Sequence, residues 1–343
     1  MLVAALGCGT REDLTGGASG GLVFVQREGH RGTLARARLA DGAIQPLWTS
    51  TRDESWPTWS AKAGRLAFQV GRTGQGARSD LWTWRPPDAD PAPIAETPHR
   101  DEAWPVWSPA AAELAFAYRG GAQAPGVAVL TFGERGPTAR PIVDAPQGSW
   151  FLRPRYAPDG ISLVAQRRIT SDSQLWILSA RGEAARALTH DPAWFHLKAA
   201  FTRDGSRVLF TRRPSGGGFA DVASVDLSGG DLRIHASTPG ADDQSGAPSP
   251  RRDELAFVSD RDGNYELYLA PLADGPAQRL TDTPDWDEGA PHWSPDGERI
   301  AVTAAPHGRS KESVEGSHIR VVDRSGKQVF DAPGLMPDWM PAW

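Results

Sequence analysis

Carboxylates recur at one position of a repeated phrase, and converging carboxylates can bind a cation. The phrase reads Glu54-Ser-Trp-Pro-Thr-Trp59, Glu102-Ala-Trp-Pro-Val-Trp107 and, at the end of the sequence, Asp338-Trp-Met-Pro-Ala-Trp343. Its weaker copies place Phe151, His196, Asp243 and Glu288 at the first position. The third position holds Trp56, Trp104, Arg153, Lys198, Ser245, Ala290 and Met340. If the copies converge, these residues form an acidic, partly aromatic ring with basic residues on one side.

Such a ring has two interpretations. Carboxylates brought together are costly unless neutralised, so the ring could bind a cationic peptide segment or a metal ion. Alternatively, the carboxylates pair with Arg72, Arg119 or Arg261, or cap local turns. The first interpretation predicts a binding set consisting of Glu54, Trp56, Glu102, Trp104, Arg153, His196, Lys198, Asp243, Glu288 and Asp338.

Motifs for catalysis or metal binding are weak in this sequence. Gly17-Ala-Ser19-Gly-Gly21 matches the pattern of a nucleophile elbow, but no strand precedes it as that motif requires. Asp260, Asp262, Asn264 and Glu266 alternate like ligands of calcium, yet the spacing of an EF-hand is not met. We therefore predict no catalytic residue and no metal ligand, and keep calcium only as an alternative.

A repeated apolar strand shows which elements position these residues. It begins at Leu22, Leu66, Leu114, Leu163, Val208, Leu255 and Ile300, at intervals of about 40–50 residues, which is the period of a β-propeller. Each period also contains three further strand segments, the first of which is the repeated phrase. The sequence thus predicts an all-β fold, a seven-bladed β-propeller of four-stranded antiparallel blades, with six blades as the alternative.

The phrase at the end of the sequence has no apolar strand after it, whereas Leu22-Val-Phe-Val has no phrase before it. We expect the C-terminal strand to complete the N-terminal blade and close the ring. Turns at Pro158-Asp-Gly160, Arg203-Asp-Gly205 and Pro295-Asp-Gly297 agree with this organisation, because glycine accepts the positive φ of a tight turn.

The blades resemble a known repeat family. Trp293-Ser-Pro-Asp-Gly-Glu-Arg-Ile-Ala-Val and Phe257-Val-Ser-Asp-Arg-Asp-Gly-Asn-Tyr-Glu-Leu-Tyr are similar to the TolB-like, or PD40, propeller repeat, a WD40-like family without the WD40 signatures. The resemblance covers residues 21–343 and implies the fold, and it explains the Asp260–Glu266 segment as a hairpin. Genuine TolB carries an α/β domain before six blades, so a TolB-like repeat rather than the role of TolB is expected.

Composition and the N-terminus indicate where the chain acts. A net charge of −5 and a pI of 5.9 argue against a nucleic-acid partner. Residues 1–8 resemble the end of a bacterial lipoprotein signal, and Cys8, the single cysteine, stands at the lipidation position. Residues 9–20 then read as a flexible tether. We predict a monomer in the cell envelope, held at the outer membrane or cell surface by a lipid on Cys8.

Three functions remain open at this point. The first is a non-enzymatic propeller that binds a protein or peptide at its mouth. The second is a carbohydrate-binding propeller that uses the aromatic residues there. The third is a metal-dependent polysaccharide lyase, because oligogalacturonate lyases are similar propellers with histidine ligands, although only His196 and His292 could contribute here.

Overall fold

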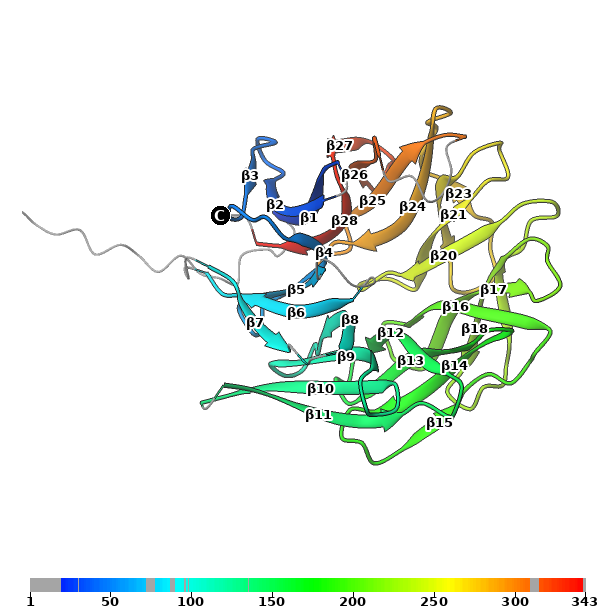
Figure 1. Cartoon of the computed structure of the whole chain (residues 1–343). Helices are drawn as coiled ribbons and strands as arrows, with labels where there is room; N and C mark the ends of the chain where they lie inside the picture. Colours follow the sequence, from blue (N-terminus) through cyan, green and yellow to red (C-terminus); the bar gives the residue numbers. More distant parts are fainter. Residues whose placement is uncertain are drawn as a thin grey trace, which may run out of the picture.

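The chain forms seven four-stranded antiparallel sheets arranged in a ring, as the repeat predicts. The computed structural model describes residues 20–29, 31–71, 78–86, 90–95, 97, 99–134, 136–308 and 315–341. Cys8 and almost all of the predicted tether lie outside these residues. Figure 1 shows the sheets following one another around the ring.

Each blade contains strands A to D from the inside of the ring to its edge. The A strands are β4 (Asp53–Ser60), β8 (Arg100–Trp107), β12 (Trp150–Tyr156), β16 (Trp194–Phe201), β20 (Asp243–Pro248), β24 (Trp286–Trp293) and β28 (Leu335–Met340). The B strands are β5 (Arg65–Gly71), β9 (Glu113–Gly120), β13 (Ser162–Ile169), β17 (Arg207–Pro214), β21 (Glu254–Ser259), β25 (Arg299–Pro306) and β1 (Gly21–Glu28).

The outer strands follow in the same order. The C strands are β6 (Ser79–Trp84), β10 (Gly126–Gly133), β14 (Asp172–Ser179), β18 (Asp221–Asp226), β22 (Glu266–Pro271), β26 (His318–Asp323) and β2 (Arg31–Arg38). The D strands are β7 (Ala92–Ala95), β11 (Gly136–Asp144), β15 (Ala185–Ala187), β19 (Arg233–Ala236), β23 (Gln278–Arg279), β27 (Gln328–Pro333) and β3 (Ile44–Pro46).

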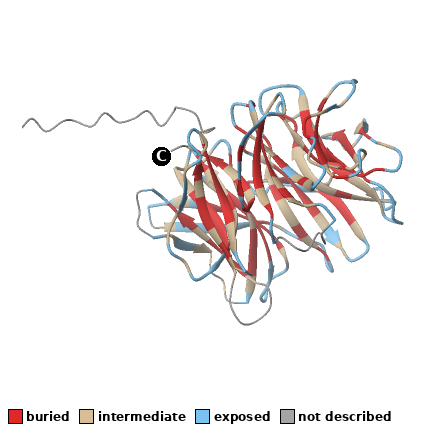
Figure 2. Cartoon of the chain, turned by 90° about the horizontal axis from the view of Figure 1, so that it is seen from above, coloured by how far each residue is buried: buried red, intermediate tan, exposed pale blue. Residues whose placement is uncertain are grey.

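The core lies between neighbouring blades. Five B strands carry a fully buried phenylalanine at their third apolar position, namely Phe24, Phe68, Phe116, Phe210 and Phe257. These rings pack against residues of the adjacent sheet, so each blade buries its apolar face on the next, as Figure 2 shows. A blade alone would leave this face exposed, and the ring is therefore one cooperative unit.

The predicted closure is confirmed, and the alternative of six blades is excluded. β28 pairs antiparallel with β1, and Figure 1 shows these first and last strands side by side in one sheet. This pairing covers the edges that the first and last strands would otherwise expose.

The predicted register of the last strand is wrong by four residues. We number the blades from the one that begins with β4. In blade one Trp59 stands opposite Leu66, and in the closing blade, blade seven, Trp339, not Trp343, stands opposite Leu22. The sequence contains the phrase twice in overlapping form, as Met336-Pro-Asp-Trp339 and Met340-Pro-Ala-Trp343, and strand pairing selects the first copy. Asp338 therefore lies deeper in the ring than the position of Glu54.

Every A strand carries a bulge at the third position of the phrase. Its residue has a positive φ in all seven blades, namely Trp56, Trp104, Arg153, Lys198, Ser245, Ala290 and Met336. The strand registers shift at the same points. Such a bulge leaves a residue outside the ladder and re-aims its side chain. In five blades a proline follows the bulge residue. Proline is tolerated there because its backbone nitrogen, which carries no hydrogen, is not required to donate a hydrogen bond to the neighbouring strand.

The register of the closing strand can be tested at its anchor. Trp339 is 5% exposed, and its indole Nε1 donates a hydrogen bond to the carbonyl of His292 at 3.1 Å. We expect Trp339→Ala to cost about 3–5 kcal/mol of unfolding free energy, because it removes a buried ring and opens a cavity. Chemical denaturation of this variant beside Trp343→Ala provides the measurement. A larger loss for Trp343→Ala would contradict the register.

Candidate functional site

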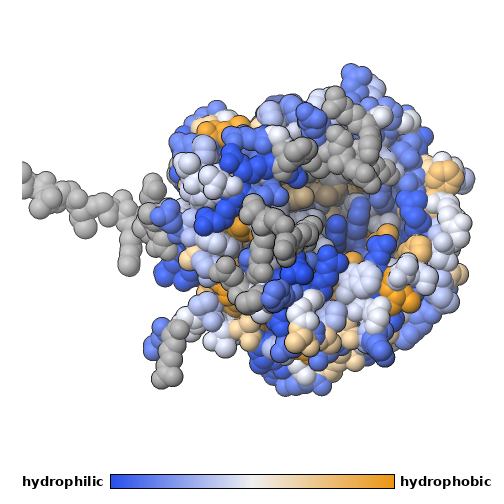
Figure 3. Space-filling view, in the orientation of Figure 1, coloured by the Kyte–Doolittle hydropathy of each residue, from blue (hydrophilic) through white to orange (hydrophobic). Residues whose placement is uncertain are grey.

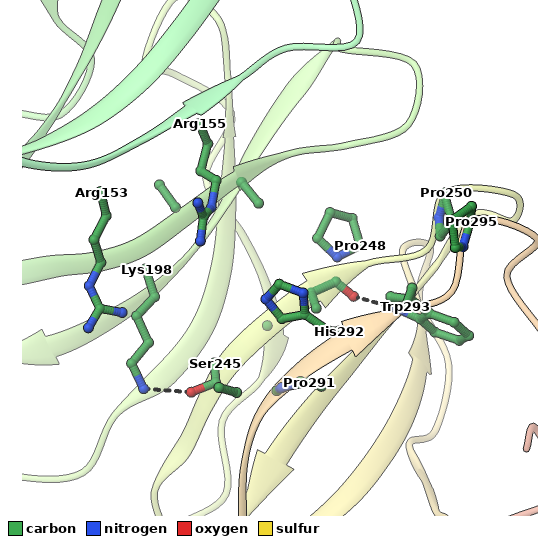
Figure 4. A pocket seen from close by; sticks show the side chains of 15 residues that line it. Arg153, Arg155, Lys198, Ser245, Pro248, Pro250, Pro291, His292, Trp293 and Pro295 are labelled. Atoms are coloured by element: carbon green, nitrogen blue, oxygen red, sulfur yellow. Dashed lines mark hydrogen bonds between the residues drawn. The ribbon is translucent and has the colours of Figure 1, made fainter. Parts of the chain in front are cut away.

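The inner strands of four consecutive blades enclose a cavity of about 330 Å³. β12, β16, β20 and β24 line it, and its polar side chains are those of Arg153, Arg155, Lys198, Ser245 and His292. In Figure 3 the face of the ring is mostly hydrophilic and is hollowed toward its middle. Figure 4 shows Arg153, Arg155 and Lys198 extending from neighbouring strands toward the same space.

The bulge geometry accounts for this convergence. The bulge residues form an upper tier of the channel, and the residues two positions further on form a lower tier consisting of Thr58, Val106, Arg155, Ala200, Ala247, His292 and Asp338. Arg153 and Arg155 thus belong to one strand but stand at two depths, with Pro154 between them. The bulge residues are those at the third position of the phrase, with Met336 in place of Met340.

The channel side chains that carry formal charge are mainly cationic. Among the described residues, no carboxylate lies within ion-pair distance of Arg153 or Arg155. The Arg153 guanidinium instead lies 5.2 Å from the centre of the Trp56 ring, and Lys198 Nζ donates to Ser245 Oγ at 2.6 Å. Burial lowers the pKa of both arginines, and Arg153 adds repulsion that lowers the pKa of Arg155 further.

Asp338 provides the acidic side chain of the lower tier. Its Oδ2 accepts a hydrogen bond from the backbone nitrogen of Trp59 at 2.8 Å, and its Oδ1 lies 3.8 Å from His292 Nδ1. Burial raises the pKa of Asp338 and lowers the pKa of His292. Both shifts reduce the charge separation between the two groups, and the attraction of Asp338 opposes only part of the lowering of the Arg155 pKa.

The other predicted acidic residues do not line an open mouth, which corrects the expected acidic ring. Glu54, Glu102, Asp243 and Glu288 are at most 3% exposed and lie between blades. Glu54 accepts hydrogen bonds from the Leu34 nitrogen at 3.0 Å and from Trp48 Nε1 at 2.9 Å. Their burial follows from the bulge, because it is the residue two positions later that turns into the channel.

Four A strands begin at or beside a doublet of acidic residues, and the first residue of each doublet is an aspartate that joins neighbouring blades. Asp53, Asp101, Asp242 and Asp287 accept a hydrogen bond from a backbone nitrogen at the start of the preceding blade's C strand. The donors are Gly32, Ser79, Ala220 and Tyr265, at 2.7–2.9 Å. We call these four contacts the interblade staples. The sequence shows them as acidic doublets at the start of A strands, a signal that our sequence analysis did not use.

The arginine partners partly match the alternative interpretation. Arg261 pairs with the buried Asp243 at 2.8 Å, as that interpretation expected. Arg119 pairs with Asp101 at 3.0 Å rather than with Glu102, and Arg72 lies outside the described residues. Most of the predicted carboxylates therefore have structural partners within the protein.

His196 and His292 do not form a ligand set for a metal. His196 is buried, lies 3.0 Å from Gln174 Oε1 and packs edge-on against Phe210, and burial lowers its pKa to about 4. No group of three or more His, Cys, Asp or Glu side chains in the described ranges could hold a metal ion. In the Asp260–Glu266 hairpin, Glu266 pairs with Arg279 at 3.0 Å.

Glu266 and Glu288 form a buried acid pair between blades five and six. Burial raises the pKa of Glu288 to about 8, with the negative charge of Glu266 adding to the shift. Burial also opposes ionisation of Glu266, but hydrogen bonds from Thr281, Thr283 and Asn264 outweigh it and lower the pKa of that carboxyl. Arg320 Nη1 lies 3.3 Å from Glu288 Oε1 and opposes this shift, but burial is the larger effect, so at neutral pH the proton is held on Glu288 while Glu266 is ionised.

This pair predicts a pH dependence of stability. A carboxyl whose pKa is raised on folding holds a proton that the unfolded chain has released, so stability falls as pH rises toward 8. We expect a decrease of about 1.4 kcal/mol per pH unit from this group, roughly between pH 5.5 and 7.5. Glu288→Gln should flatten this slope in denaturation curves measured across that range. An unchanged slope would contradict a protonated Glu288.

Comparisons with known proteins agree with the fold. No protein-family model matches the chain. A stretch of 58 residues is 47% identical to the uncharacterized peptidase YuxL of Bacillus subtilis (strain 168), covering 17% of this chain and 9% of that protein. No helix among the described residues has the length and apolarity needed for a membrane span.

Solved structures cover far more of the chain. Puromycin hydrolase superposes with a TM-score of 0.69 at 16% identity, over 94% of this chain and 53% of that one. TolB from Acinetobacter baumannii superposes with a TM-score of 0.58 at 17% identity, over 94% of this chain and 82% of that one. The chain thus spans about half the length of the hydrolase, and at these identities the likeness shows that it shares the propeller fold of TolB.

Proposed function

We propose that this propeller binds a protein or peptide partner at the channel described above. The observation that supports this most directly is the cavity between β12 and β24, where basic side chains meet an apolar lining. Partner binding in a recess of this kind uses apolar burial for affinity and a few placed charges for orientation. The TolB and peptidase propellers of the same fold are consistent with a protein ligand.

The aromatic residues of the upper tier strengthen this proposal. Trp56 and Trp104 are partly exposed at the bulges of β4 and β8, the two A strands that precede the basic strands, and the Trp56 ring contacts Arg153. Rigid aromatic surface beside positive charge is typical of sites that bind protein segments. Of the originally predicted binding set, Trp56, Trp104, Arg153 and Lys198 remain candidates for direct contact, together with Asp338.

Site-specific photo-crosslinking tests the proposal. Ala290 lines the cavity, and its counterparts Trp56 and Trp104 show that the same bulge accepts a large aromatic side chain. We expect benzoylphenylalanine at position 290 to yield covalent adducts with a protein partner in the producing cell. The same residue at Val329, which lies on an outer strand and is 37% exposed, serves as the matched control.

Two results would count against the proposal. One is the absence of protein adducts at position 290, and the other is an identical adduct pattern at positions 290 and 329.

We further propose that the propeller is held in the bacterial cell envelope by a lipid on Cys8. The support is the small, apolar sequence before this single cysteine. Palmitate labelling of the protein in the producing cell should give a labelled product whose processing is blocked by globomycin. Failure to incorporate label, with Cys8→Ser as the reference, would reject the anchor without affecting the proposal for the channel.

A further inference from the structure

Three basic side chains line one cavity of the channel. Two guanidinium groups from one strand and an ammonium group from the next surround one cavity, although the whole chain has a net charge of −5. Each of these groups lies on the lining of the channel rather than on the outer surface. This concentration of one sign within an acidic protein requires an explanation.

Structural roles account for only part of these charges. Lys198 has hydrogen bonds to Ser245 and, at 3.3 Å, to Gln244 on the neighbouring A strand. Arg153 rests on the Trp56 ring. For Arg155, by contrast, no hydrogen bond or ion pair occurs among the described residues, and its compensation is limited to the longer-range attraction of Asp338. A partly buried guanidinium is costly to keep without an acceptor, and the cost rises when a second one stands two residues away.

The shape of the space favours an extended ligand. A second cavity of about 410 Å³ shares Arg155, Pro248 and Pro250 with the first and continues past Tyr156 and Phe201. Arg155 therefore lies where the two cavities meet. The remaining walls are mostly proline, alanine and aromatic side chains, which suit the apolar parts of a peptide and offer few polar partners for a small hydrophilic anion.

We infer that Arg153, Arg155 and Lys198 bind a carboxylate carried by a peptide segment that enters the channel. This inference rests on the proposed function and specifies its ligand. Guanidinium groups bind carboxylates through paired, charge-assisted hydrogen bonds, and Arg155 is placed to provide such a pair. The carboxylate could be an acidic side chain or a free C-terminus, and both present the same group.

Calorimetric titration of the full chain with defined peptides tests the inference at low ionic strength. The probes are end-blocked decapeptides of alternating Glu and Ala, Lys and Ala, or Gln and Ala, and the Gln-Ala peptide with a free C-terminus. We expect the Glu-Ala peptide to bind at least about tenfold more tightly than the Lys-Ala peptide. Tighter binding of the free-acid Gln-Ala peptide than of its blocked form would assign the carboxylate to a C-terminus.

Substitutions assign the effect to the channel. Arg155→Gln and Arg153→Gln should each weaken binding of the preferred peptide about tenfold or more, the usual loss for a hydrogen bond to a charged group. Arg252→Gln removes the same charge from the turn between β20 and β21, outside the lining of both cavities, where Arg252 pairs with Glu298 at 2.8 Å, and should leave binding unchanged. Melting curves of all three variants establish that they are folded.

The possible failures are distinguishable. Equal binding of the acidic, basic and neutral peptides would overturn the carboxylate site while leaving a peptide-binding channel intact. Binding that is unaffected by both Arg153→Gln and Arg155→Gln would overturn the site even if acidic peptides were preferred. No binding of either carboxylate-bearing peptide would also overturn it, and the photo-crosslinking experiment would then decide the broader proposal separately.

Discussion

The ring depends on hydrogen bonds that cross from one blade to the next. In four blades an aspartate at the start of the A strand accepts a hydrogen bond from a backbone nitrogen at the start of the preceding blade's C strand, at 2.7–2.9 Å. That donor faces the neighbouring sheet, so without the aspartate it would be a buried group without an acceptor. The staples therefore satisfy the backbone at the seam and fix the angle between adjacent blades.

The position of the staples determines the character of the channel. Because the acidic doublets are held between blades, their charges do not reach the lumen. The bulge that follows turns a different residue inward, and in blades three and four this residue is Arg153 or Lys198. These two blades lack an acidic doublet, with Trp150-Phe151 and Phe195-His196 in its place, and the closing blade lacks one too, with Pro333-Gly334 at that position. Acidic side chains thus join neighbouring blades where the doublets occur, whereas in blades three and four basic side chains face the cavity.

The sequence was sufficient to predict the architecture but not the roles of the acidic residues. Periodicity of the B strands fixed the number of blades, and the unmatched Leu22 strand predicted the closure. The last register could not be decided, because Met336–Trp339 and Met340–Trp343 carry the same pattern and only pairing with β1 distinguishes them. The bulge was also invisible, since it depends on backbone angles that tryptophan, arginine, lysine and serine adopt here alike.

Because the sequence does not reveal the bulge, the predicted positions of the site residues were also partly wrong. Counting along the A strand placed Glu54 and Trp56 on the same surface. The bulge instead leaves Glu54 buried between blades and turns Trp56 toward the channel. Arg155 was missed because the lower tier becomes visible only when the cavity is known. In a regular strand, alternation predicts which side chains share a face, and the bulge breaks that alternation at the positions that line the channel.

The central claim is that the acidic doublets serve as interblade staples, and amide hydrogen exchange measures this directly. We expect the backbone amides of Gly32, Ser79, Ala220 and Tyr265 to exchange as slowly as those of the buried B strands, because each needs separation of two blades to open. Exchange of these four amides at the rate of exposed turn amides would contradict the account, since the doublets would then be free to face the channel.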